Sequence, residues 1–139
     1  MRRLLSLMSL ALALSLPACG DATGPGDGID GVWTLETVNG AALPITLPTL
    51  QDGTVIVVLS GAITLNVDGT FRDLTTYRIT ETGKAARDED DVYEGTFLKT
   101  RSGATLTPVI PAGLDPYLVG IADGVLTQRI GDYTLAYRR

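Results

Sequence analysis

Histidine is absent from all 139 residues, and cysteine occurs once, at Cys19. Without histidine the chain has no Ser-His-Asp or Cys-His catalytic pair and lacks the commonest zinc ligand. An internal disulfide needs two cysteines, so none can form. No P-loop or dinucleotide-binding glycine motif is present either. We therefore expect a protein that is not an enzyme and that holds no cofactor or metal.

The long hydrophobic run at the start of the sequence is too short to cross a bilayer. It extends from Leu4 to Leu16, after Arg2 and Arg3, and is followed by Pro17 and Ala18. A membrane-spanning helix needs about 20 apolar residues. Basic residues, a short apolar run and a small residue before a cleavage point are typical of a secretory signal peptide. The sequence thus predicts that residues 1–18 are an export signal.

The residues around this predicted cleavage point carry a resemblance. The stretch Leu16-Pro17-Ala18-Cys19 resembles the lipobox of bacterial lipoproteins, in which the cysteine receives a diacylglycerol; Pro17 is a less usual occupant of its position. The resemblance implies that Cys19 is the lipid-attachment site. It also implies a location in the cell envelope, on the periplasmic face of the outer membrane. A free thiol or an intermolecular disulfide at Cys19 is the alternative.

Positive charge is scarce in the part of the chain that would remain after cleavage. Of the 11 basic residues nine remain, against 16 acidic ones. Such a surface repels phosphate groups, which argues against nucleic acid as a partner. It also repels anionic lipid headgroups, so the lipid on Cys19 would have to provide the membrane attachment.

The mature chain is predicted to begin with a tether. Residues 20–30 contain four glycines and three aspartates, a composition that cannot bury enough apolar surface to fold. We expect a lipidated flexible tether over residues 19–30 and one domain over residues 31–139.

Beyond the tether, short alternating runs rich in β-branched and aromatic residues are separated by glycine-containing turns. Asn39-Gly40, Asp68-Gly69 and Asp123-Gly124 are typical of tight hairpins. Gly61 predicts a bulge in one long strand. The predicted strands cover residues 32–38, 54–67, 70–79, 92–98, 104–108, 117–121, 125–130 and 133–137. About eight strands joined in sequence order favour an all-β fold, an antiparallel up-and-down β-barrel; a β-sandwich is the alternative.

The two ends of this predicted domain resemble the lipocalin-like, or calycin, pattern. Gly31-Val32-Trp33 matches a Gly-x-Trp opening, and Arg138 or Arg139 supplies a basic residue on the closing strand. The resemblance implies that Trp33 closes one barrel end and that one of these arginines packs across its ring. It also implies a small apolar ligand inside the barrel, but it assigns no ligand-binding residue. The apolar, proline-rich loop at residues 41–50 departs from the pattern.

Two other functions stay open. The barrel, if filled, would be a structural or protein-interaction module of the envelope with an unknown protein partner. An envelope hydrolase is the third and weakest candidate.

The carboxylates have competing interpretations. The run Asp88-Glu89-Asp90-Asp91 is either a calcium site or a solvated hairpin loop, and its spacing favours the loop because it lacks the alternation of a calcium-binding sequence. Asp73 shares a face with Phe71 and Tyr77, so it points into the barrel or, from a bulged strand, into water. If buried, it needs a partner such as Arg129 or a tyrosine hydroxyl, and it becomes a candidate ligand contact. Further candidate interior side chains are Tyr77, Tyr93, Tyr133 and Tyr137.

Overall fold

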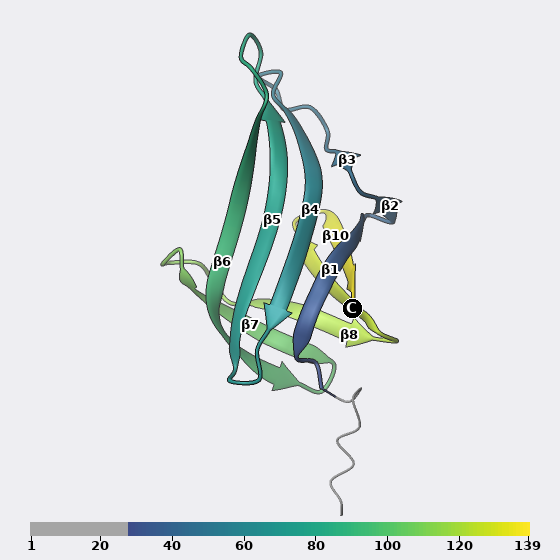
Figure 1. Cartoon of the computed structure of the whole chain (residues 1–139), viewed down its shortest axis with the longest axis vertical. Helices are drawn as coiled ribbons and strands as arrows, with labels where there is room; N and C mark the ends of the chain where they lie inside the picture. The colour runs from purple at the N-terminus through teal and green to yellow at the C-terminus, as the bar shows by residue number, and fades with distance from the viewer. Residues whose placement is uncertain (1–27) are drawn as a thin grey trace, which may run out of the picture.

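The computed structural model describes residues 28–139, which fold into ten β-strands (Figure 1). The strands are β1 (Gly31–Val38), β2 (Ala41–Ala42), β3 (Ile45–Thr46), β4 (Val55–Leu65), β5 (Thr70–Thr80), β6 (Arg87–Thr100), β7 (Gly103–Ile110), β8 (Tyr117–Ala122), β9 (Val125–Ile130) and β10 (Tyr133–Arg138). The predicted signal peptide, Cys19 and most of the predicted tether lie outside the described residues. Within residues 28–139 no helix is long and apolar enough to cross a membrane.

Eight of the strands close into an antiparallel barrel. Each strand from β4 to β10 pairs with the next one in the sequence. β1 closes the circle, because its first half pairs with β4 and its second half pairs with β10. The predicted up-and-down barrel is thereby confirmed, and the β-sandwich alternative is wrong. The short strands β2 and β3 pair only with β1 and β4, outside the closed circle.

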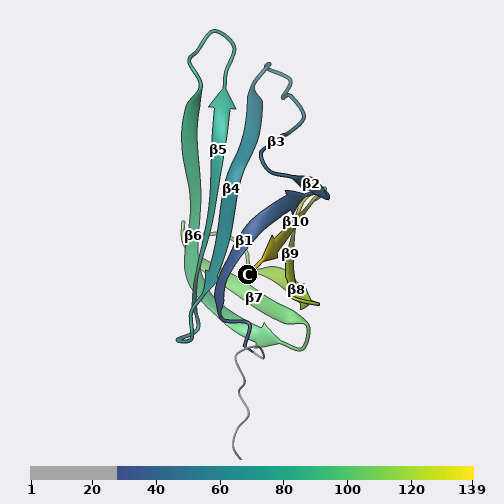
Figure 2. The same cartoon turned by 45° about the vertical axis from the view of Figure 1, so that its right-hand side comes forward.

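The barrel walls differ in height. Strands β4, β5 and β6 rise well past the ends of the other strands and form one tall wall (Figure 1). Figure 2, turned by 45°, shows β7 to β10 grouped at the lower part of this wall, with β1 in front of them. The segment containing β2 and β3 follows the upper part of β4, where Ile45 lies opposite Val58. It covers the stretch of β4 that β1 is too short to reach.

Glycine sets the geometry of the hairpins. Asn39-Gly40 and Asp123-Gly124 have positive φ at both residues, which is the type I′ turn expected of these pairs. Asp68-Gly69 differs, since only Gly69 has positive φ and the Asn66 amide donates to the Thr70 carbonyl across a three-residue loop. The predicted bulge in β4 is also present, as a register shift between Val58 and Ser60.

The hydrophobic core fills the end of the barrel where β1 begins. Alternate residues of each strand point inward, and the largest fully buried side chains all lie in this half. They are Trp33, Ile63, Leu65, Leu106, Leu126 and Tyr137. Each such side chain contributes about 1.5–3 kcal/mol when removed from water, so this half of the barrel carries most of the packing energy.

The sequence favoured a hairpin loop for the acidic run, and this prediction is wrong. Strand β6 already begins at Arg87, so the run lies within the strand. Asp88, Glu89, Asp90 and Asp91 pair in register with β5, and the loop before them is shorter than expected. Aspartate disfavours strands, but cross-strand partners override this preference: the Arg78 guanidinium lies 2.7 Å from the Asp88 carboxylate.

Candidate functional site

Trp33 closes one end of the barrel. Its indole Nε1 donates a hydrogen bond to the Ile29 carbonyl at 2.9 Å, and its side chain is only 2% exposed. The Arg139 guanidinium carbon lies 4.4 Å from the centre of the Trp33 ring, within cation–π range. Of the two candidate arginines, Arg139 therefore makes the contact, whereas Arg138 lies outside and pairs with Glu36 at 3.0 Å.

The residues that lead into β1 lie across the same end. Gly31 begins β1 with a φ of 130°, and the Gly28 carbonyl accepts a hydrogen bond from Arg139. The Lys99 ammonium lies 2.9 Å from the Asp30 carboxylate. Together with Trp33, these contacts block access to the interior from this side.

A polar cluster crosses the middle of the barrel around Asp73, which is 3% exposed. Its Oδ2 accepts hydrogen bonds from the Tyr117 hydroxyl at 2.9 Å and from the Gln128 amide at 3.2 Å. The Gln128 Oε1 in turn accepts one from the Tyr137 hydroxyl at 2.8 Å. Asp73 thus points inward, and its partner is a tyrosine hydroxyl; Arg129, the other candidate, is exposed and makes no ion pair with it.

The sequence interpretation missed two members of this cluster. Gln128 occupies the inward position between Leu126 and Ile130, so strict alternation along β9 would have found it. Tyr117 is the first residue of β8. The start of a strand cannot be located from the sequence to within one residue, and a shift of one residue changes the face on which the side chain lies. The expected tyrosines do lie inward: Tyr137 is fully buried, and Tyr77, Tyr93 and Tyr133 pack against the core.

Burial dominates the electrostatics of the cluster. It raises the pKa of Asp73, which the hydrogen bonds from Tyr117 and Gln128 lower in part and the charge of Asp91 raises further. Burial and the nearby Asp73 also raise the pKa values of Tyr117 and Tyr137 well above the ordinary range. Both tyrosines therefore keep their protons and act as hydrogen-bond donors.

Beyond the cluster, at the end opposite Trp33, the barrel contains a cavity of about 340 Å³. Thr75, the next inward residue of β5 after Asp73, lies in its wall. The apolar wall residues come from five strands and from the segment after β3. They are Val38, Leu47, Ile56, Val58, Ile79, Ile130 and Leu135. Leu47 is held there by a 2.8 Å hydrogen bond from its amide to the Ile56 carbonyl, so the unusual loop at residues 41–50 completes the cavity wall.

One wall of the cavity carries negative charge. On β6, Glu89 lies opposite Tyr77 and Asp91 lies opposite Thr75, and all four side chains line the cavity. Asp88 and Asp90 point the other way, where Asp88 pairs with Arg78 and Asp90 accepts a 2.7 Å hydrogen bond from the Thr76 hydroxyl. The alternation of the strand thus divides the acidic run between two faces.

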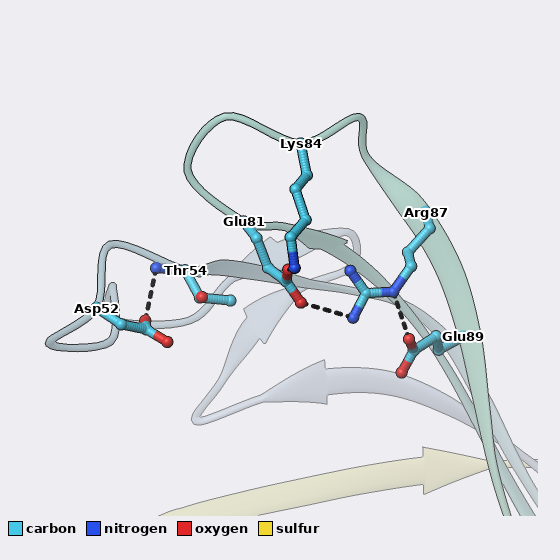
Figure 3. A network of polar contacts seen from close by, with 6 residues as sticks. All are labelled: Asp52, Thr54, Glu81, Lys84, Arg87 and Glu89. Carbon is cyan, nitrogen blue, oxygen red and sulfur yellow. Dashed lines mark hydrogen bonds and ion pairs between the residues drawn. The ribbon is translucent and has the colours of Figure 1, made fainter.

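Glu89 has a cationic partner. The Arg87 guanidinium lies 2.6 Å from Glu89 and 2.9 Å from Glu81, which also pairs with Lys84. Figure 3 shows Arg87 between the two glutamates, beneath the loop that joins β5 to β6.

The acidic run does not form a metal site. Its four carboxylates point to two different faces of β6 and do not converge. Within residues 28–139 no group of three or more acidic or cysteine side chains is placed to hold a metal.

The other hollows are less suited to a ligand. Hollows of about 420 and 590 Å³ lie outside the closed end, next to Gly28 and Asp30, and the larger is bordered by Val67, which is 92% exposed. A hollow of about 250 Å³ lies beside the loop between β7 and β8. The cavity opposite Trp33 is therefore the candidate site.

Comparisons of the chain with models of protein families, with curated proteins and with solved structures find no match.

Proposed function

We propose that the protein is a non-enzymatic, lipocalin-like lipoprotein of the cell envelope whose barrel binds a small apolar molecule. The observation that carries this proposal is the cavity of about 340 Å³ with predominantly apolar walls. Cavities that bind small molecules are of this kind, with volumes of about 300–1,000 Å³, apolar walls and a few placed polar groups. A barrel filled along its whole length would not support binding.

Two features of the sequence support the envelope part of the proposal. Residues 1–18 have the organisation of an export signal, and Cys19 follows a lipobox-like stretch. The contact between Trp33 and Arg139 supports the lipocalin-like part, since it is the arrangement that the resemblance implies. The acyl chains on Cys19 would hold the protein at the membrane, and the barrel would present its open end to the periplasm.

Binding can be tested with N-phenyl-1-naphthylamine, an uncharged probe whose fluorescence rises in apolar surroundings. Val58 is 4% exposed and lines the cavity, so Val58→Phe fills the space and should weaken probe binding at least about tenfold. Val57 is its outward neighbour on β4, and Val57→Phe should leave binding unchanged.

Stability must be measured in the same experiment, because overpacking costs about 1–3 kcal/mol. Leu135→Phe, on β10, provides a second filling variant. Equal probe binding by folded Val58→Phe, folded Leu135→Phe and the unmodified protein would refute the proposed site.

The alternative, an interaction module of the envelope, is favoured by one observation. Leu98 and Leu118 are 75% and 69% exposed, and both lie beside Thr105 on the outer face of β6, β7 and β8. Such a patch suits a protein partner better than water. Leu98→Ser would weaken attachment to such a partner and leave probe binding in the cavity unchanged.

A further inference from the structure

The charges around the cavity indicate which apolar molecules it favours. Its wall contains Glu89 and Asp91 and no lysine or arginine. Glu89 is balanced by Arg87, and the two outward members of the acidic run have partners of their own. Asp91 forms no ion pair within residues 28–139. The cavity wall thus contains one carboxylate without an ion pair among the described residues, opposite Thr75.

A second carboxylate lies deeper. Asp73 is one inward position further along β5, on the side of the closed end, and it is buried without an ion pair among the described residues. Its hydrogen bonds come from neutral donors, so no cation cancels its charge when it is ionised. The wall opposite Thr75 therefore carries the unpaired negative charge of Asp91, which favours positive ligands and repels anions.

Aromatic rings lie in the same walls. Tyr77 and Tyr133 line the cavity, and Tyr77 is the strand neighbour of Glu89. Burial and the charge of Asp91 raise the pKa of Tyr77, so its ring is uncharged at neutral pH. The face of an uncharged aromatic ring attracts an ammonium group, as in the aromatic cages that bind quaternary ammonium ligands.

We propose, building on the function proposed above, that the ligand is a lipophilic amine: an organic cation whose ammonium group lies against Asp91 and Tyr77 and whose apolar body lies among Val58, Ile79 and Leu135. An inorganic cation fits poorly. Calcium needs six to eight oxygen ligands, whereas most of the cavity wall is apolar and Glu89 is already paired with Arg87. An organic cation satisfies both the carboxylate and the apolar surface.

Three ligands of equal chain length separate charge from hydrophobicity: octylamine, octanol and octanoate, titrated calorimetrically into the full chain at pH 7 and low salt. Octylamine is protonated at this pH and should bind about fivefold more tightly than octanol, since its ammonium group is attracted to Asp91. The difference is no larger because Asp91 is exposed and water screens this attraction. Octanoate should bind more weakly than octanol. Raising the salt concentration should reduce these differences.

The decisive variant is Asp91→Asn, which should make octylamine and octanol bind equally and leave octanol binding unchanged. Asp90→Asn removes the same charge from the outer face of the same strand and should retain the preference. A preference that persists in Asp91→Asn, or equal binding of octylamine and octanol to the unmodified protein, overturns the amine proposal while octanol binding still supports the cavity. If none of the three ligands binds, the proposed function itself fails, and the amine proposal with it.

Discussion

At the scale of single residues, the chemistry of the interior depends on Asp73. A buried carboxylate that receives hydrogen bonds only from neutral groups is costly to ionise, which is why its pKa is raised. The two hydrogen bonds to Oδ2 hold the side chain in one orientation and, through Gln128, connect it to Tyr137. The cluster lies next to the cavity along β5, because Thr75, the inward residue after Asp73, is in the cavity wall.

This residue predicts how stability changes with pH. The folded protein holds the Asp73 proton more tightly than the unfolded chain does, so the stabilisation from this group is complete below the unfolded pKa, about 3.9. It is lost as the pH rises through the raised pKa of the folded protein. The Asp73→Asn variant has no carboxyl group at this position and does not lose stability in this way. The free energy of unfolding of the variant, minus that of the unmodified protein, should therefore increase as the pH rises from 4 to 7. Urea unfolding at several pH values measures this, and a difference that does not change with pH would show that Asp73 is not desolvated.

At the scale of elements, alternation and turn residues predict most of the barrel. The inward series Phe71, Asp73 and Thr75 follows directly from period two along β5, and the Asp-Gly and Asn-Gly pairs locate three of the hairpins. What the sequence could not reveal depends on contacts between distant residues. Counting charges assigns residues 88–91 to a loop, because their cross-strand partners on β5 become visible only when the strands are paired.

The candidate site, too, could be predicted only in part from the sequence. The sequence places Asp73 on the face of Phe71 and Tyr77, leaves open whether that face is inward, and suggests several inward tyrosines, but the cavity arises from differences in strand length. β1 is too short to cover the upper part of β4, so Leu47 and its neighbours complete the wall. A run of apolar residues such as 41–50 has no periodicity that would indicate this role. The division of the acidic run into Asp88 and Asp90 outside and Glu89 and Asp91 inside likewise follows from the register of β6.

At the scale of the whole molecule, the barrel has two unlike ends. Trp33, Arg139 and the residues before β1 close one end, and the predicted lipid attachment at Cys19 precedes that end in the sequence. The cavity lies at the other end, opposite Trp33. If the proposed attachment at Cys19 is correct, the closed end is the one that follows it in the sequence and the cavity lies at the other end.

Attachment through Cys19 can be tested by fractionation. Cys19→Ser removes the proposed acceptor of the lipid, and the excess of acidic over basic residues would not attract the chain to an anionic membrane surface. The variant should therefore appear in the soluble envelope fraction or accumulate as unprocessed precursor. Cosedimentation of Cys19→Ser with outer membranes at high salt, at the level of the unmodified protein, would contradict the lipoprotein proposal.

The central claim is that a small apolar molecule binds in the cavity opposite Trp33, and methyl NMR spectroscopy of the full chain tests it most directly. On titration with octanol, the methyl signals of Val58, Ile79 and Leu135 in the cavity wall should shift progressively and saturate. Those of Leu65 and Leu106, in the filled half of the barrel, should stay in place. Shifts confined to Leu98 and Leu118 on the outer face, or no saturable shift at all, would contradict the claim.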